Sequence, residues 1–348
     1  YAFLCLLLVL TCAVAVRAAD TLDIWVIDVE GGKALIVQNP SGQTMMIDGG
    51  SPDMPARAGA PPQQKERDLN RVAAVAAAAG IKEFDVYLIT HYDVDHVGNV
   101  PFIYQRFPAK LLIDHGPLLP NPKLAQVNRN AADAYVAFLP GKKRLSVKPG
   151  DVLPFKDVKV TVLTSNEEVI KKALPGGGKP NPACPATLPE PVRGDDNAAS
   201  IGTLWEFGKF RMADFADALQ WVEMKLMCPN NPVGTVDLLM GSHHGMPASS
   251  SPALIHALAP KAIITNNGER KGIAPDVVKT MRSSPGIQDI WQLHYSVTAG
   301  PDNNAPEQFL ANMKQQDCQG FSIKVSAKRD GSFTITNMRN NFSKTYKK

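Results

Sequence analysis

Four side chains that can bind a metal ion lie within six positions of the sequence, at His91, Asp93, Asp95 and His96. The carboxylates of the two aspartates repel each other unless a cation joins them. The apolar segment 84–90 comes immediately before this run and is predicted to be a buried strand. In α/β folds, the loop that follows such a strand commonly exposes reactive groups. The run therefore predicts a metal-binding loop rather than a polar surface turn.

A second candidate is the pair His243 and His244, which follows the apolar segment 236–240. One of these imidazoles is expected to bind metal, and the other to position the substrate or to support a ligand. His115 and His294 also follow apolar segments and could face the same cleft. For each of these two, a hydrogen-bonded histidine without a metal is the favoured interpretation.

The elements that would position these residues alternate along the chain. Strands or strand-rich stretches are predicted at 22–29, 34–37, 44–47, 84–90, 110–113, 145–163, 199–207, 210–217, 236–240, 262–265, 290–294, 321–325 and 333–336. Helices are predicted at 68–79, 100–107 and 128–138, with three more between the later strands. Two mixed β halves with helices outside predict an α/β fold, one four-layer αββα sandwich, rather than two separable domains. We expect a single domain over residues 20–348, with a Pro/Gly-rich insertion at 171–197 that is either a lid or a plain insertion.

The pattern His-x-Asp-x-Asp-His-x-Gly after a strand resembles the signature of the metallo-β-lactamase superfamily, in the variant where Asp93 replaces the second histidine. That variant is similar to the hydrolase domain of the ComEC-type competence proteins. Other motifs of that group have counterparts here in the same order: Asp28-Val29-Glu30-Gly31-Gly32, Asp48-Gly49-Gly50, Asn197 with Ser200, and Ser242-His243-His244-Gly245. The resemblance covers most of residues 22–300, and it implies the four-layer sandwich with a metal centre.

The resemblance also implies two divalent metal ions. Zinc is favoured, and manganese or iron competes because Asp93 makes the ligand set harder. A bridging aspartate is expected at a strand end in the second half, where Asp217 and Asp214 both fit. Asp217 is favoured because Ala216-Asp217 most resembles the family's Gly-Asp.

The full set of residues implied for the site has two parts. The metal ligands are His91, Asp93, Asp95, His96, Asp217, His243 and His244, of which Asp95 and His244 are expected to take part in catalysis. The residues expected to support these ligands or to contact the substrate are Asp48, His115, Asn197, Asp214 and His294.

The chain departs from the family pattern in two places. The extra histidine that usually serves the first metal is absent from 193–197, so this metal site is expected to be poor in ligands. The Gly-His-Pro of the competence proteins is also missing, because Asn266-Asn267-Gly268 leads instead to Ile273-Ala274-Pro275. Any phosphate contact made by that histidine is therefore lost.

A hydrolytic reaction follows from such a centre. A water shared by two metal ions about 3.5–4 Å apart would lose its proton near neutral pH, and the hydroxide could attack a carbonyl or phosphoryl centre. Hydrolysis of a phosphodiester is the favoured function, and hydrolysis of a lactone, ester or β-lactam is the alternative. A metal-supported binding module without turnover is a third hypothesis, which the intact run at 91–96 disfavours. The sequence contains no G-x-S-x-G nucleophile motif, which agrees with a metal-based reaction.

Composition and the N-terminal segment bear on location and partners. Lys and Arg number 37 against 33 Asp and Glu, and this small, scattered excess does not indicate nucleic-acid binding. Residues 1–16 are uncharged and almost wholly apolar, and Arg17-Ala18-Ala19 follows, which predicts a signal peptide at 1–19; an uncleaved anchor is the alternative. No later segment is long and apolar enough to span a membrane. We therefore expect an exported protein, periplasmic or extracellular.

Three cysteines remain after the predicted cleavage, at Cys184, Cys228 and Cys318. An oxidising compartment permits one disulfide among them, and the sequence does not choose the pair. None of the three lies in a C-x-x-C pair, which disfavours a zinc site built on cysteine.

Overall fold

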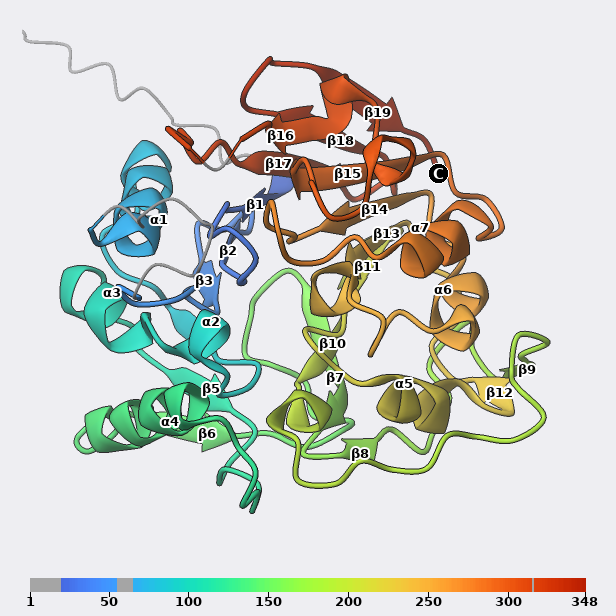
Figure 1. Ribbon diagram of the computed structural model, residues 1–348, viewed down its shortest axis with the longest axis horizontal. Coiled ribbons are helices and arrows are strands. Elements are labelled where there is room, and N and C mark those ends of the chain that lie inside the picture. The colour runs from blue at the N-terminus through green and yellow to red at the C-terminus, as the bar shows by residue number, and fades with distance from the viewer. Residues whose placement is uncertain (1–19, 55–64, 315) are drawn as a thin grey trace, which may run out of the picture.

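The computed structural model describes residues 20–54, 65–314 and 316–348. The predicted signal peptide at 1–19 lies outside the described residues. Within them, no helix has both the length and the apolar character needed to cross a membrane. Two β-sheets face each other, and each carries helices on its outer face (Figure 1). The predicted four-layer αββα sandwich is confirmed.

The first sheet has nine described strands in the order β19-β18-β17-β1-β2-β3-β4-β5-β6. The strands are β1 Thr21–Val26, β2 Leu35–Gln38, β3 Thr44–Ile47, β4 Val86–Leu88, β5 Leu112–Asp114, β6 Arg144–Ser146, β17 Ile323–Lys328, β18 Phe333–Asn337 and β19 Ser343–Tyr346. Strands β1 to β3 form an antiparallel meander, whereas β3 to β6 run parallel because helices connect them.

The second sheet has eight described strands in the order β16-β15-β14-β13-β11-β10-β7-β8. The strands are β7 Lys159–Ser165, β8 Glu168–Val169, β10 Gly202–Phe207, β11 Phe210–Asp214, β13 Leu238–Gly241, β14 Ala262–Thr265, β15 Asp289–His294 and β16 Leu310–Asn312. Strands β11, β13, β14, β15 and β16 are parallel, so their carboxyl ends lie at one edge.

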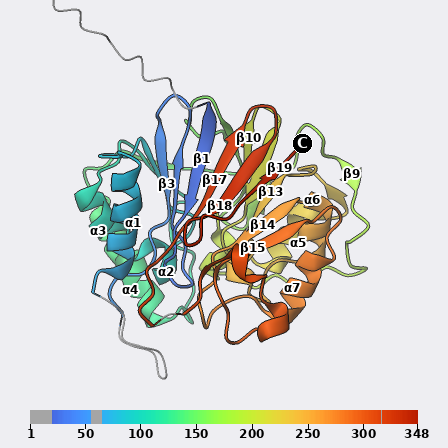
Figure 2. The same cartoon turned by 90° about the horizontal axis from the view of Figure 1, so that it is seen from above.

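The helices divide between the two outer faces, as the view from above shows (Figure 2). The first sheet carries α1 Arg67–Ala78, α2 Val94–Val97, α3 Val100–Arg106 and α4 Gln126–Phe138. The second sheet carries α5 Gln220–Met227, α6 Pro252–Leu258 and α7 Pro275–Arg282. Four short 3-10 turns are η1 Asp196–Ala199, η2 Ser242–Gly245, η3 Pro301–Asn303 and η4 Glu307–Phe309.

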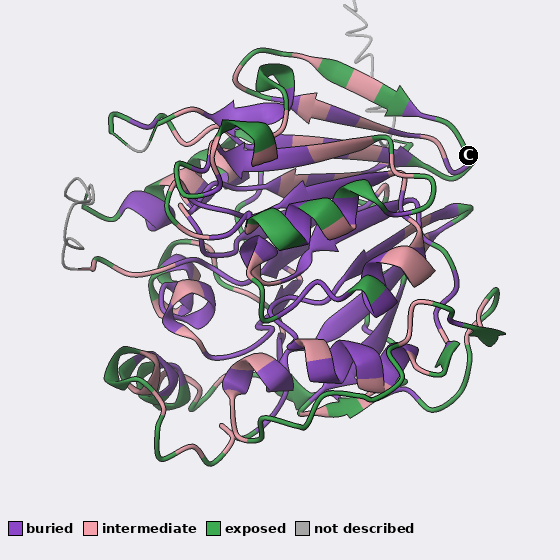
Figure 3. Ribbon diagram, turned by 45° about the vertical axis from the view of Figure 1, so that its right-hand side comes forward, coloured by how far each residue is buried: buried purple, intermediate pink, exposed green. Residues whose placement is uncertain are grey.

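The apolar core is layered in the same way as the fold. The largest cluster lies between the sheets and includes Trp205, Phe207 and Trp291, all fully buried. Two further clusters lie between each sheet and its helices, around Tyr87 on the first face and Phe215 on the second. Burying a large apolar side chain contributes about 1.5–3 kcal/mol. In Figure 3 most strands are largely buried, whereas edge strands such as β6 and β19 and many helix positions are exposed.

The insertion at 171–197 is attached to the helical face of the second sheet. Its strand β9 (Lys179–Pro180) pairs with β12 (Asn230–Asn231), which follows α5. A disulfide joins Cys184 to Cys228, and Cys318 is a buried free thiol. Of the three possible pairs, the disulfide is therefore Cys184–Cys228.

Several expected strand boundaries differ from the structure, and the end of β11 and the C-terminal strands matter most. The strand expected to run to residue 217 ends at Asp214, because the chain turns through a left-handed residue, Ala216, with φ 48°. The predicted C-terminal hairpin does form, but β19 extends it. Strand β17 also pairs with β1, so the C-terminal strands complete the first sheet rather than the second.

Candidate metal centre

The carboxyl ends of β4, β11 and β13 bring four metal-competent residues together between the two sheets. We call Asp95, His96, Asp217 and His244 the Asp95 cluster. One ligand atom from each residue lies within 4.8 Å of the others. Asp95 and His96 lie in the loop and short helix α2 after β4, Asp217 follows β11, and His244 follows β13. Both halves of the sandwich therefore contribute candidate ligands.

The distances within the Asp95 cluster suit a bound ion. His96 Nε2 lies 3.3 Å from Asp217 Oδ1, 3.4 Å from His244 Nε2 and 3.7 Å from Asp95 Oδ2. His244 Nε2 lies 3.0 Å from Asp217 Oδ2 and 3.3 Å from Asp95 Oδ2. Nitrogen and oxygen ligands about 2.0–2.2 Å from a tetrahedral ion are about 3.4 Å from one another. The four residues therefore fit a divalent metal ion.

Hydrogen bonds on the far side of each imidazole orient the two histidines of the cluster. His96 Nδ1 donates to Asp48 Oδ2 at 2.8 Å. The Asp48 carboxylate is itself fixed, because it accepts bonds from the backbone N–H and the hydroxyl of Thr90 at 2.8 and 2.7 Å. His244 Nδ1 donates to the Asn266 carbonyl at 3.1 Å. Both rings thus present Nε2 to the cluster, as supported metal ligands do.

The backbone at the centre is strained. Asp48, Ala216, His243 and His244 all have φ between 48° and 58°, a region that side-chain-bearing residues seldom adopt. Such residues persist only where the surrounding structure holds them, and they concentrate at functional sites. Here a hydrogen bond from the His243 N–H to the Ala216 carbonyl, at 2.8 Å, joins two of these turns.

A further group of polar residues lies beside the Asp95 cluster. His91 is fully buried, its ring centroid is 4.1 Å from that of His96, and its Nε2 has no hydrogen-bond partner. The carboxylate of Asp93 accepts bonds from Asn128 at 2.6 Å and from Asn197 at 3.3 Å. An unpaired buried nitrogen is costly. His91, Asp93 and Asn197 are therefore the residues available for a second ion.

Without a cation nearby, both ionisable residues of this second group favour their neutral forms. Burial, together with the nearby carboxylates of Asp95 and Asp196, raises the pKa of Asp93 to about 8. Burial and the neighbouring His96 lower the pKa of His91 to about 3. A neutral imidazole binds metal directly, and a nearby cation would favour the ionised form of Asp93.

Burial alone would favour the neutral form of Asp217, yet its pKa lies well below the usual range. The charge of His244 is the largest cause of this lowering, followed by those of His96 and His243. His243 itself is half-buried at the mouth of the centre, with its Nε2 3.5 Å from Asp217 Oδ2 and its Nδ1 3.1 Å from Ser249 Oγ. His244 is thus the histidine inside the cluster, and His243 lies at its edge.

Three residues predicted for the site make other contacts. Asp214 accepts a 2.5 Å bond from Lys33, which leaves Asp217 as the aspartate that faces the histidines. His115 stacks on Tyr92, with ring centroids 4.2 Å apart, and its Nε2 lies 3.5 Å from Asp196 Oδ1. His294 lies in a separate group.

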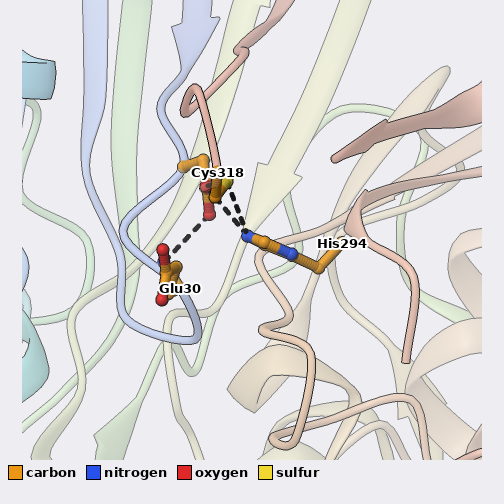
Figure 4. A group of neighbouring side chains, drawn as sticks. Glu30, His294 and Cys318 are labelled. Atoms are coloured by element: carbon orange, nitrogen blue, oxygen red, sulfur yellow. Dashed lines mark hydrogen bonds and ion pairs between the residues drawn. The ribbon is translucent and has the colours of Figure 1, made fainter. Parts of the chain in front are cut away.

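That separate group consists of Asp28, Glu30, His294 and Cys318, and we call it the Asp28 cluster. Figure 4 shows His294 and Glu30 directed toward the same point as the Cys318 thiol. His294 Nε2 lies 2.9 Å from Asp28 Oδ2, and Cys318 Sγ lies 3.4 Å from the same oxygen. His294 is therefore hydrogen-bonded to Asp28, which agrees with the interpretation favoured from the sequence.

Two residues of the centre carried no sequence motif. Lys271 Nζ lies 2.5 Å from Asp95 Oδ2, although the loop from Asn266 to Pro275 was notable only for lacking a histidine. Asp196 accepts a 2.5 Å bond from the Tyr92 N–H and lies between the metal loop and His115. A charged residue next to Asn197 was the only available signal for Asp196.

Comparisons with known proteins found a matching family model and several distant relatives. Residues 27–184 match the family model described as the metallo-beta-lactamase superfamily. Over these residues the chain is similar to the metallo-β-lactamase superfamily. The superfamily is generally hydrolytic, and its members bind divalent metal ions, often two.

Individual proteins that resemble this chain have low sequence identity to it. ComE operon protein 3 of Bacillus subtilis (strain 168) is 27% identical over 194 residues, which are 55% of this chain and 21% of that protein. The chain thus spans about a fifth of the length of that relative. Among solved structures, the metallo-beta-lactamase fold protein YhfI from Bacillus subtilis is 12% identical with a TM-score of 0.45, over 78% of this chain and 96% of that one. Igni18, a metallo hydrolase from Ignicoccus hospitalis, is 13% identical with a TM-score of 0.43, over 77% and 95%.

Proposed function

We propose that the protein is an exported, metal-dependent hydrolase that cleaves a phosphodiester-type substrate. The observation that carries this proposal is the Asp95 cluster, in which two imidazoles and two carboxylates from both halves of the fold converge within 4.8 Å. Such a ligand set, with supported imidazoles and a side open to solvent through Asp95, suits a catalytic rather than a closed structural ion.

The donor set also bears on the metal. Asp95, His96, Asp217 and His244 would hold one ion, and His91, Asp93 and Asn197 would contribute to a second, weaker site. Zinc suits the imidazole nitrogens of this ligand set, and manganese or iron suits its carboxylate oxygens. Bound divalent ions would supply Lewis-acid chemistry and would lower the pKa of a water molecule toward neutrality.

The residues of this chain would prepare the site for that chemistry. Asp48 holds His96 in the tautomer that leaves Nε2 free, and the Asn266 carbonyl does the same for His244. His243, at the mouth and linked to Ser249, can hold or release a proton beside the substrate. A carboxylate-rich centre suits hard metal ions, and such ions favour a phosphoryl oxygen over a neutral carbonyl.

Two observations support export. The segment 1–16 has the composition of a signal peptide. The disulfide between Cys184 and Cys228 is a bond that persists in oxidising compartments and is rare in the cytosol.

The proposal can be tested with one purified sample. The protein is stripped of metal with a chelator, reloaded in turn with zinc, manganese or iron, and its metal content is measured by elemental analysis. Each form is assayed with bis-p-nitrophenyl phosphate, a homoserine lactone, a p-nitrophenyl ester and nitrocefin. We expect metal-dependent turnover of the phosphodiester. Turnover of only the lactone, ester or nitrocefin would contradict the proposed substrate class, and bound metal with no turnover would favour a binding module.

A matched pair of histidine variants controls this experiment. His244→Ala removes a ligand of the Asp95 cluster, and we expect a loss of at least about a hundredfold in activity together with lower metal content. His256→Ala removes a histidine on α6 whose Nε2 contacts Thr280 and Ser283, outside the cluster. This control should retain both metal and activity.

A further inference from the structure

The loop between β14 and α7 places a lysine at the mouth of the Asp95 cluster. Lys271 Nζ lies 2.5 Å from Asp95 Oδ2, the oxygen that also faces His244 and His96. The Lys271 side chain is 25% exposed and that of Asp95 is 20% exposed, whereas His96 and His244 are buried. The ammonium group therefore lies between the cluster and the solvent.

The aliphatic part of Lys271 is held in a prepared slot. A Cβ added to Gly31, in the turn after β1, would lie 3.1 Å from Lys271 Cβ and 3.2 Å from its Cδ. Only a glycine leaves this space, and Gly31 has a φ of 93° that further favours glycine. The lysine thus enters the centre between two parts of the chain that pack closely.

The loop that carries Lys271 is also attached to the cluster. The Gly268 N–H donates to the Lys271 carbonyl at 2.9 Å, which closes the turn. The Ile273 N–H donates to the His244 carbonyl at 3.2 Å, two residues after the lysine. The position of the ammonium group is therefore coupled to that of a cluster histidine, as a residue that orients a substrate requires.

The charges at the mouth determine which partner this ammonium group favours. A divalent ion bound by Asp95 would compete with Lys271 for the same carboxylate and would repel the ammonium. The favourable partner is then another anion that enters from the solvent side. An ammonium group is a point charge that suits a phosphate oxygen.

We propose that Lys271 binds the anionic, non-bridging oxygen of the phosphodiester and thereby positions the phosphorus at the centre. This inference rests on the proposed function and deepens it. It assigns to Lys271 a phosphate contact, although the chain lacks the histidine expected in this loop. Lys271 is a positioning residue and acts in binding rather than in proton transfer.

The test measures anion binding separately from turnover. Inorganic phosphate is titrated by calorimetry into metal-loaded wild type, Lys271→Gln, Lys271→Arg and Arg270→Gln. We expect Lys271→Gln to weaken phosphate binding about tenfold or more, and Lys271→Arg to retain it. Arg270 is an exposed cation in the same loop, so Arg270→Gln controls for the loss of one charge and should change binding less than about twofold.

Kinetics supply a second measurement. For bis-p-nitrophenyl phosphate, Lys271→Gln should raise KM about tenfold with little change in kcat, and hydrolysis of the neutral ester p-nitrophenyl acetate should not change. Metal content should equal that of the wild type. Wild-type phosphate binding that Lys271→Gln weakens, without any phosphodiester turnover, would contradict the proposed function while still supporting a phosphate contact at Lys271. Wild type that binds no phosphate, equal binding by Lys271→Gln, or loss of metal from Lys271→Gln would overturn the inference.

Discussion

The Asp95 cluster and the Asp28 cluster contain similar residue types but differ in their counter-charges. In the Asp28 cluster, Arg71 lies 2.8 Å from Asp28 and 3.0 Å from Glu30, and Arg67 lies 2.9 Å from Glu30. Two guanidinium groups thus pair with the two carboxylates of this cluster, and Arg67 also pairs with Asp68. The Asp95 cluster has one lysine, at its solvent side, and among the described residues no arginine forms an ion pair with it.

This difference separates a polar cluster that is completed by cations of the fold from the cluster that we propose as the metal site. Fixed cations within the fold complete the Asp28 cluster, which joins the end of β1 to the end of β15 and so connects the two sheets. In the Asp95 cluster, no described arginine offsets the charge of the carboxylates beside the imidazole nitrogens. A divalent ion is the partner that such a set lacks.

The sharpest test of this comparison changes one aspartate in each cluster to the isosteric asparagine. We expect Asp217→Asn to lower activity by about a thousandfold or more and to reduce metal content. The reason is that the proposed carboxylate ligand between His96 and His244 is lost. Asp28→Asn should retain activity per folded molecule within about twofold but should lower the free energy of unfolding. Steady-state kinetics, elemental analysis and urea unfolding give the three readouts. The comparison fails if the two variants behave alike.

The second prediction removes the counter-charge from the Asp28 cluster. Arg71→Met leaves Asp28 and Glu30 less compensated in a buried site, and we expect the free energy of unfolding to fall by about 3 kcal/mol. If counter-charge is what distinguishes the clusters, added zinc should restore part of this loss, because Asp28, His294 and Cys318 can then hold a cation. Zinc-dependent urea unfolding measures the effect. The double variant with Cys318→Ser is the control and should respond less, and no zinc response in Arg71→Met would refute the explanation.

The third prediction concerns pH. The ionised Asp28, followed by the bond to it, overcomes burial and raises the pKa of His294 to about 10. The charged pair therefore stabilises the fold fully below the unfolded histidine pKa of about 6.5, and this contribution declines as pH rises to about 10. His294→Gln can keep the contact at Nε2 but cannot titrate. Its deficit in unfolding free energy should shrink progressively between these pH values. A constant deficit across this range would show that the pair is not ionised.

Short sequence motifs predicted which residues would converge at the candidate centre. Contacts between distant positions could not be predicted in this way. Asp95, His96 and His244 follow strands in recognisable short patterns, so their convergence could be expected from the sequence. The sequence favoured Asp217 over Asp214 because Ala216-Asp217 resembles the family's Gly-Asp. The structure distinguishes the surroundings of the two aspartates, because Lys33, from a distant turn, reaches Asp214. The metal-binding roles themselves stay predictions.

Other features of the molecule depend on pairs of residues that no sequence window contains. Lys271 approaches Asp95 across 176 positions, and Arg71 reaches Asp28 across 43. The partner of Cys184 is set by the pairing of β9 with β12, two very short strands. Such contacts follow from the packing of the two halves, which periodicity and spacing do not describe.

The pairing of β1 with β17 has a consequence for how the protein is made. The second strand of this pair lies about 300 positions after the first, so a chain still on the ribosome cannot close its first sheet. Until β17 arrives, one side of β1 offers unsatisfied backbone groups to other chains. A chaperone that holds the nascent chain, or transport before folding, would protect this edge, and chains cut short before residue 323 should aggregate rather than accumulate as a smaller folded enzyme.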